Sequence, residues 1–276
     1  MKKSEFEKQF APETKEIAVL IGATGFGAGR ARKEKYWTVN AGITAWQDVS
    51  SGSVHVVENC LLSAMVENTD ELRDKLKANS IITVKARKGE KHFLLREVIE
   101  SGNAYPELEK ILEEQLKPVY YKDAGLGTFT LDKSINTFNN EIEWLGKSID
   151  VSFDLGTEEE MRDAVSVLHA LVKEQSGWDA RARAFAAEEL TDLANDWQDE
   201  EDDEDEDGED DEDSGDGEDG EITEEEFARR IILESVSVDA DGAFNFWFGD
   251  DDLFYGHVIC VEGDIKDGFE SADIMG

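Results

Sequence analysis

Residues 199–221 hold 18 acidic side chains, five glycines or serines and no basic residue. Carboxylates at this density repel one another and bring no apolar surface to bury, so the segment cannot belong to a packed core. We expect a disordered acidic insert that interrupts a folded domain. Its simplest role is solubility. The alternatives are weak binding of calcium or of a cationic partner, and masking of the basic loop 30–35, which has a net charge of +3.

The remaining 253 residues are acidic but otherwise have the composition of a globular protein. The formal charge of the chain is −38, of which the insert supplies 18. With 14 Phe and 6 Trp among 276 residues, the chain can build a core, and its length favours two domains or one large one. A charge of this sign disfavours nucleic acid and anionic lipid as partners.

Targeting signals and cysteine usage predict a cytoplasmic protein. The longest apolar run, residues 17–23, is too short to cross a bilayer, and the first ten residues lack the apolar core of a secretory signal. Cys60 and Cys260 lie too far apart in sequence to suggest a disulfide framework, which fits a reducing compartment.

The first half of the chain is rich in strand patterns. We expect a disordered tail over residues 1–12 and a β-rich domain over 13–121, for which a barrel is one arrangement. The predicted strands of this domain are 16–21, 36–46, 54–66, 80–86 and 92–99. Its predicted helices are 69–77, capped by Thr69, and 105–116.

The second half, residues 122–276, predicts an α+β domain. A three-stranded meander over 128–155, with a turn at Asn139 and Asn140, precedes two helices at 157–172 and 178–197. Three more strands, 232–239, 243–248 and 256–262, follow the acidic insert. This order favours an antiparallel sheet covered on one face by the two helices. One face of the strand ending at Leu155 is polar, because Ser and Asp alternate there with apolar residues.

The run from Gly22 to Gly29 resembles a dinucleotide-binding loop, but its context differs. Such a loop must open a helix that packs on the preceding strand. Here a charged segment and another strand follow, so a glycine-rich loop between two strands is the better interpretation. Arg30, Arg32, Lys33 and Lys35 beside Tyr36 and Trp37 could contact a nucleic acid single strand, although the charge of the chain opposes this.

The best candidate site is Asp250, Asp251 and Asp252 with His257. Carboxylates near an imidazole could hold a divalent ion or act as an acid–base pair. Cys260 would lie on the opposite face of the strand from His257, which argues against a zinc site. The structural alternative is that these residues form hydrogen bonds within a polar turn. No other catalytic motif is present, and we predict no cofactor.

Several segments together resemble a bacterial family, domain of unknown function 2262. The resemblance covers about residues 122–276, with a β-rich region of the kind that often precedes it, and includes the following positions: Trp144, Trp178, Asn195, Trp197, Phe227, Asp251, Asp252, Phe254, Gly256 and His257. It implies a non-secreted bacterial protein without an established reaction. Members are similar to proteins found near polymorphic-toxin loci, which implies immunity-type binding. The acidic insert replaces a connection that is short in the family.

Two functions remain open from the sequence. The first is a non-catalytic, immunity-type interaction module whose acidic surface binds a basic protein. The second is a metal-dependent hydrolase or another enzyme that uses Asp250–Asp252 and His257. The sequence favours the interaction module, because no catalytic pattern that it contains occurs in the structural context that the corresponding chemistry requires.

Overall fold

The structure, a computed structural model, describes residues 3–99, 103–204 and 221–276. The chain divides into two compact units. The first comprises Met1–Val119 and Lys133–Ile135, and the second comprises Tyr120–Asp132 and Asn136–Gly276. The sequence placed the boundary two residues later, after residue 121.

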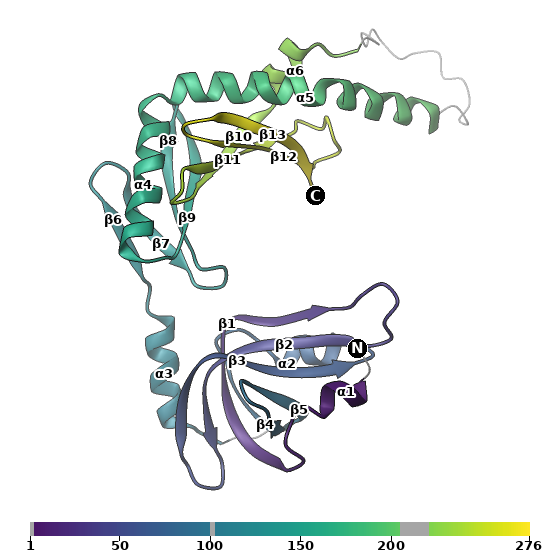
Figure 1. Cartoon of the computed structure of the whole chain (residues 1–276), viewed down its shortest axis with the longest axis vertical. Coiled ribbons are helices and arrows are strands. Elements are labelled where there is room, and N and C mark those ends of the chain that lie inside the picture. The colour runs from purple at the N-terminus through teal and green to yellow at the C-terminus, as the bar shows by residue number, and fades with distance from the viewer. Residues whose placement is uncertain (1–2, 100–102, 205–220) are drawn as a thin grey trace. The chain divides into compact units, whose positions relative to one another are not determined.

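The N-terminal unit is a closed five-stranded barrel in the order β1-β2-β3-β5-β4 (Figure 1). Its strands are β1 (Thr14–Gly29), β2 (Trp37–Asp48), β3 (Val54–Val66), β4 (Ile81–Lys88) and β5 (His92–Ile99). Only β3 and β5 pair in parallel within this barrel. Together with a helix between β3 and β4, this is the arrangement of the Greek-key barrels called OB folds.

Strand alternation fills the barrel. Every second residue along β1 and β2 points inward, so Ile17, Val19, Val39 and Ala41 are at most 2 % exposed. Helix α2 (Asp70–Lys75) leads to the fully buried Leu76, which packs with the barrel core. Thr69 stands at its N-cap but makes no capping bond with its side chain, contrary to the prediction.

The glycine run is part of a strand and not of a loop, which corrects the prediction. Strand β1 continues to Gly29 and pairs with β2 as far as Thr38. Its register shifts between Ile21 and Phe26. Within this shift Gly25 has a φ of 61°, and a Cβ there would lie 2.9 Å from the backbone nitrogen of Ala78. The glycines therefore permit a bulge, and no helix follows that could bind a dinucleotide.

The N-terminal segment is folded over its described part, which corrects the predicted tail over residues 1–12. Helix α1 (Lys3–Glu7) and the residues after it bury Phe6 and Phe10 against Met65 and Leu94 on the outside of the barrel. The guanidinium of Arg87 donates to the carbonyl oxygens of residues 7, 10 and 11 at 2.5–3.1 Å. Two aromatic side chains and one guanidinium thus hold the segment in place.

Helix α3 (Pro106–Leu116) packs on the outer surface of β1 and β2, as its apolar face predicted. Leu108 is fully buried beside Ala18, Leu20 and Ala45. The side-chain amide of Gln115 donates to the carbonyl oxygen of Ile21 at 3.2 Å, so a hydrogen bond also connects α3 to β1.

The C-terminal unit contains an eight-stranded sheet in the order β13-β12-β11-β10-β9-β8-β7-β6. Its strands are β6 (Tyr120–Asp123), β7 (Gly127–Asp132), β8 (Thr137–Trp144), β9 (Lys147–Asp154), β10 (Ile232–Val238), β11 (Ala243–Gly249), β12 (Val258–Asp264) and β13 (Gly268–Met275). The predicted α+β class is confirmed. The two edge strands, β6 and β13, were not predicted.

Two features of this sheet correct the sequence analysis. The sheet is mixed and not wholly antiparallel, because β10 pairs in parallel with β9. Asn139 and Asn140 lie inside β8 and do not form a turn. The turn comes earlier, at Asn136, whose φ is 57°, and Asn140 donates its side-chain amide to the carbonyl oxygen of Leu126 at 2.6 Å.

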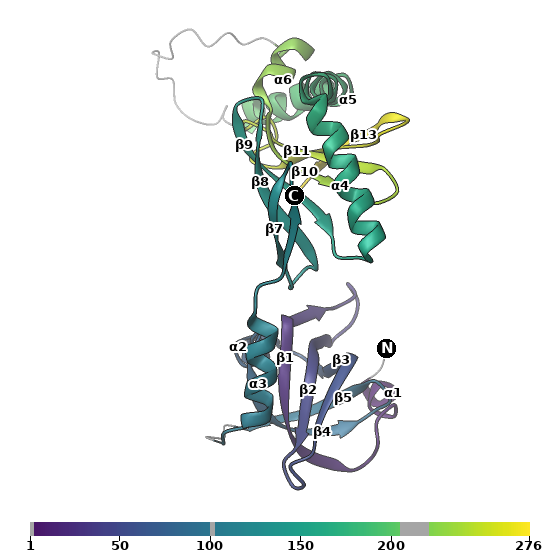
Figure 2. The same cartoon turned by 90° about the vertical axis from the view of Figure 1, so that its left-hand side faces the viewer.

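Helices α4 (Glu158–Lys173) and α5 (Gln175–Glu204) cover one face of the sheet, as predicted (Figure 2). Leu168 and Leu171 of α4 and Ala182 and Ala186 of α5 are fully buried in the core. Thr157 and Glu160 form a capping box at the start of α4.

Helix α5 runs seven residues beyond the predicted end at Trp197, so the first residues of the acidic stretch are helical and not a disordered loop. Residues 205–220, which make up most of the predicted insert, lie outside the described residues. Helix α6 (Glu224–Arg230) follows, with Thr223 as its N-cap. In the described residues, no helix is both long and apolar enough to cross a membrane.

Candidate functional site

The turn before β12 contains the four predicted site residues, and Asp250 organises it. Asp250 is 5 % exposed, and its Oδ2 accepts the backbone N–H groups of Phe254 at 2.8 Å and of Gly256 at 3.1 Å. A carboxylate that accepts two backbone donors satisfies groups that would otherwise be buried without a partner. Asp250 therefore acts on the backbone of its own turn.

Asp251 connects this turn to helix α6. Its Oδ2 lies 3.0 Å from Nε of Arg230, and the same guanidinium donates to the Asp251 carbonyl oxygen at 2.7 Å. Asp251, Asp252 and Tyr255 all have φ between 51° and 61°, the left-handed region. Aspartates adopt this conformation more readily than most residues, which explains their position in so tight a turn.

His257 also binds within the turn. Its Nδ1 is hydrogen-bonded to the carbonyl oxygen of Phe254, and its ring meets the ring of Trp197 edge-on at a centroid distance of 5.6 Å. Across the described ranges, no group of three or more His, Cys, Asp and Glu side chains is placed to hold a metal ion. The observed bonds thus support the structural interpretation for Asp250, Asp251 and His257, whereas Asp252 contributes a residue in the left-handed region to the turn.

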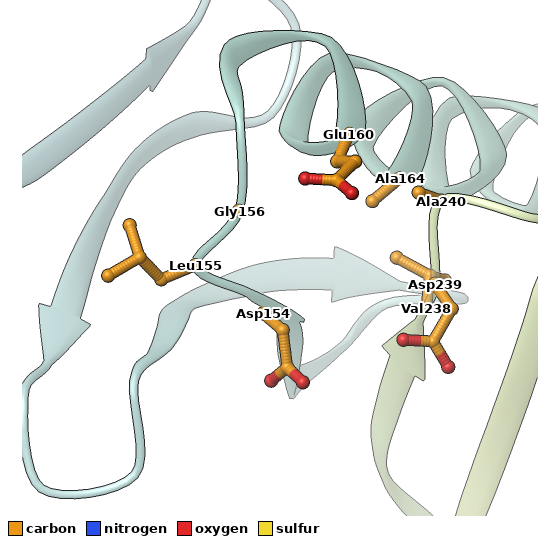
Figure 3. Close-up of a pocket in the computed structure, with 8 residues that line it drawn as sticks. All are labelled: Asp154, Leu155, Gly156, Glu160, Ala164, Val238, Asp239 and Ala240. Carbon is orange, nitrogen blue, oxygen red and sulfur yellow. The ribbon is translucent and has the colours of Figure 1, made fainter. Parts of the chain in front are cut away.

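A pocket of about 220 Å³ lies where the parallel strands β9 and β10 end (Figure 3). Asp154 is the last residue of β9, Asp239 follows β10, and Glu160 belongs to the first turn of α4. Side chains that follow parallel strands meet at one edge of a sheet, where ligands commonly bind. The pocket could not be predicted from the sequence, because the residue pattern of neither strand indicates that β9 and β10 pair in parallel.

The carboxylates of the pocket differ in how they are engaged. Glu160 accepts the backbone N–H of Thr157 at 2.7 Å, and Asp154 accepts the hydroxyl of Thr137 at 2.9 Å. The pKa of Asp239 is raised, first by desolvation and then by repulsion from Asp154 and Asp241. The pocket therefore favours a cationic group, which would relieve this repulsion.

The face of the sheet opposite α4 and α5 is lined with polar and acidic side chains; we call it the open face. The strand registers align one row of side chains across six strands: Glu141, Asp150, Ser235, Trp247, Cys260 and Asp273. Glu143, Asp154, Glu262 and Asp264 share the same face by alternation. The polar alternation predicted for β9 is part of this surface.

The acids of the open face form no ion pairs within the part of the chain that the structure describes, although Lys122 of β6 lies on the same face by register. Among the described residues, no ion pair involves any of seven carboxylates: Glu141, Glu143, Asp150, Asp154, Glu262, Asp264 and Asp273. Glu141 even stands directly opposite Asp150 on the neighbouring strand. Like charges in this position destabilise a sheet, so the fold retains them at a cost in stability.

The centre of the open face is apolar. Trp247 is half-buried, its indole N–H lies 3.3 Å from the hydroxyl of Ser237, and Cys260 is directly opposite it. Val258 and Met275 occupy the same face, and Met275 is 39 % exposed. An aromatic centre within a polar rim is the usual anatomy of a protein–protein interface. Trp247 was not predicted as a site residue, although its alternation with the core phenylalanines of β11 places it on the opposite face of the sheet.

The remaining predicted candidates are engaged in local contacts. The guanidinium of Arg30 lies 4.5 Å from the centre of the Trp37 ring, and Lys35 pairs with Glu67 at 2.9 Å. The contacts of Arg30 and Lys35 are therefore local to their own unit. His169, which was not a predicted candidate, pairs with Asp123 at 3.0 Å between its Nε2 and the carboxylate.

Comparisons with known proteins agree with the division of the chain. Residues 123–274 match the family described as "Uncharacterized protein conserved in bacteria (DUF2262)", and residues 2–115 match "Domain of unknown function (DUF7021)". No curated protein and no solved structure matches the chain.

Proposed function

Since the chain belongs to the DUF2262 family of uncharacterised bacterial proteins, we propose a function from its surface: it is a non-catalytic interaction protein that binds a basic protein partner. The binding surface is the open face of the C-terminal sheet, centred on Trp247. The observation that carries this proposal is the row from Glu141 to Asp273, in which unpaired acids flank an aromatic centre.

The charge of the surface indicates the kind of partner. A basic face would replace the repulsion between Glu141 and Asp150 with attraction, and long-range attraction would accelerate the encounter. The acidic pocket at the end of β9 lies beside this face and suits a lysine or arginine side chain. A partner that must be captured quickly, such as a toxin blocked by its immunity protein, matches these properties.

Charge reversal on the open face tests the proposal. The full chain would be tagged and purified from its own bacterium as wild type and as the triple variant E141K/D150K/D273K. We expect a basic protein to co-purify with the wild type, to cross-link to the open face, and to bind the variant about tenfold more weakly or worse.

A matched control changes the same number of charges on α5. Glu188, Glu189 and Asp192 are exposed on the helix, so the triple variant E188K/E189K/D192K alters the net charge equally but leaves the open face intact. If the partner binds the open-face variant normally and is lost from the helix variant, the open face is not the binding surface.

A further inference from the structure

The C-terminal sheet has two edge strands, β6 and β13, which differ in how they are protected. An edge strand presents backbone N–H and C=O groups that can pair with another chain, and proteins guard such edges with short strands, lysine or proline. Strand β6 has four residues, one of which is Lys122. Strand β13 has eight residues and contains neither lysine nor proline. Of the strands that the structure describes, β13 pairs only with β12, so its outer edge is open to a further strand.

The acidic row of the open face continues to this edge. Asp273 is exposed, is the last member of the row and lies opposite Cys260, while Ser271 on the same face lies opposite Glu262. Burial first, and then the negative charges of Glu262 and Asp273, raise the pKa of Cys260 to about 12. Both carboxylates therefore act on the same part of the face. A strand added beside β13 would place every second side chain next to this negative charge.

The helix face of β13, opposite the open face, is apolar and incompletely covered. Ala272 is 9 % exposed, whereas Phe269 and Ile274 are only half-buried against the core. The ring of Phe185 on α5 stacks on that of Phe269 at a centroid distance of 5.7 Å, and the guanidinium of Arg181 lies 6.0 Å from the same ring. An apolar side chain from a neighbouring strand would extend this surface, whereas a second cation there would be repelled by the guanidinium.

From these two faces we propose that β13 pairs with an extended segment of the basic partner, in which basic and apolar residues alternate. The basic side chains lie on the open face beside Asp273, and the apolar side chains lie on the helix face beside Ile274. This inference rests on the proposed function, because it concerns the same partner and the same acidic surface, and it adds how the partner binds. Backbone hydrogen bonds would supply affinity, and the alternating side chains would supply specificity.

A second copy of this chain fits the edge less well than a basic segment does. Antiparallel pairing of two β13 strands would join the two open faces and bring Asp273 of each copy toward the acids of the other. Like charges on neighbouring strands destabilise a sheet. The register shift between Glu262 and Gly263 further confines regular pairing along β13 to residues 271–275, which suits a short segment.

Two synthetic peptides of one composition test the alternation on the full chain. The peptide KVKVKVKVK places its lysines on one face of a strand, whereas KKVVKKVVK distributes them over both faces. We expect calorimetry at about 0.15 M salt to show at least about tenfold tighter binding of the alternating peptide. In two-dimensional NMR this peptide should slow hydrogen exchange at alternate amides between Ser271 and Met275, those that face away from β12.

Two proline variants separate strand pairing from charge. Successive N–H groups of a strand face opposite edges, so one of Ser271→Pro and Ala272→Pro removes a donor to β12 and the other removes a donor that faces solvent. Thermal unfolding identifies the second kind by its smaller loss of stability. We expect that variant to bind the alternating peptide about tenfold more weakly. The matched control Asp273→Asn keeps its N–H and removes one charge, so it should weaken both peptides about two- to threefold.

Three outcomes would overturn the proposal: equal affinity of the two peptides, unchanged exchange of the β13 amides with the alternating peptide, or a dimer of the chain alone in which these amides are already protected. All three are measured on the wild-type chain, so they decide the question even if neither proline variant folds.

The co-purified partner separates this inference from the proposed function. If the partner is lost from E141K/D150K/D273K but binds the tolerated proline variant normally, the open face is the binding surface and pairing with β13 is wrong. Normal binding of the triple variant would contradict the proposed function itself.

Discussion

The two units of this chain differ most in charge. Residues 1–119 contain 18 basic and 18 acidic side chains and are neutral overall, so the remaining 10 basic and 48 acidic side chains account for the whole net charge of −38. The barrel pairs its charges, for example Lys85 with Glu97 and Arg96 with Glu7. The open face of the C-terminal sheet leaves its acids unpaired among the described residues.

The net charge of the whole chain therefore does not describe the charge of either unit. The charge that disfavours anionic partners belongs to the C-terminal unit, and residues 1–119 carry no net charge. A strongly acidic face and a barrel without net charge can coexist because their charges lie in separate folding units. Each unit has a core and one buried cysteine of its own, Cys60 and Cys260, which allows the two to be measured separately.

The largest expected effect comes from truncating each core in turn. Phe246 and Leu62 are at most 1 % exposed in the C-terminal and N-terminal cores. Phe246→Ala should cost about 3–5 kcal/mol and Leu62→Ala about 2–5 kcal/mol of unfolding free energy, each in its own unit. Alkylation of Cys260 and Cys60 in increasing denaturant, followed by mass spectrometry, measures the two transitions. If Phe246→Ala exposes both cysteines together, the units do not unfold independently.

A smaller effect is expected in the turn before β12. Asp250→Ala should cost about 1–3 kcal/mol, because the N–H groups of Phe254 and Gly256 lose their acceptor. Asp252→Asn is the matched control in the same turn, and we expect it to be close to neutral. Unfolding in urea measures both. A divalent ion that binds the wild type stoichiometrically and is lost from Asp250→Ala without destabilisation would favour the enzymatic alternative instead.

The smallest effect concerns pH. The pKa of Asp239 is raised in the folded state, so the folded protein holds this proton more tightly than the unfolded chain. The C-terminal unit therefore loses stability as the pH rises from the ordinary range of an aspartate through this higher pKa. Asp239→Asn should remove that loss and stabilise the unit at neutral pH by less than about 1 kcal/mol, since solvent screens the group.

Unfolding at several pH values checks this prediction, with Asp192→Asn on α5 as the control for removal of one exposed charge. Equal pH profiles for wild type and Asp239→Asn would show that neither the desolvation of Asp239 nor its repulsion by Asp154 and Asp241 affects folding.

Most strands could be predicted where the pattern is local. The bounds of β3 and β5 match the prediction at both ends, because each is a continuous run of strand-forming residues. The corrections have physical causes. Phe6 and Phe10 are too few to predict a buried segment until Met65 and Leu94 are known to receive them. Asn139 and Asn140 are typical turn residues, yet the pairing of β8 with β9 places them in a strand.

The candidate sites differ in the same way. The turn from Asp250 to His257 could be located because its residues are adjacent in sequence. The open face could not, since Glu141, Trp247 and Asp273 meet only through five strand registers, one of them parallel.

The parallel pair β9–β10 also affects how the protein is made. Strand β9 ends at Asp154 and β10 begins at Ile232, so a ribosome must synthesise residues 155–231 before β9 gains its second neighbour. Until then β6, β7, β8 and β9 form a partial sheet in which β9 is an unpaired edge strand, open to pairing with other nascent chains. Because long-range parallel pairing is slow, aggregation during synthesis competes with completion of this sheet more than with closure of the barrel.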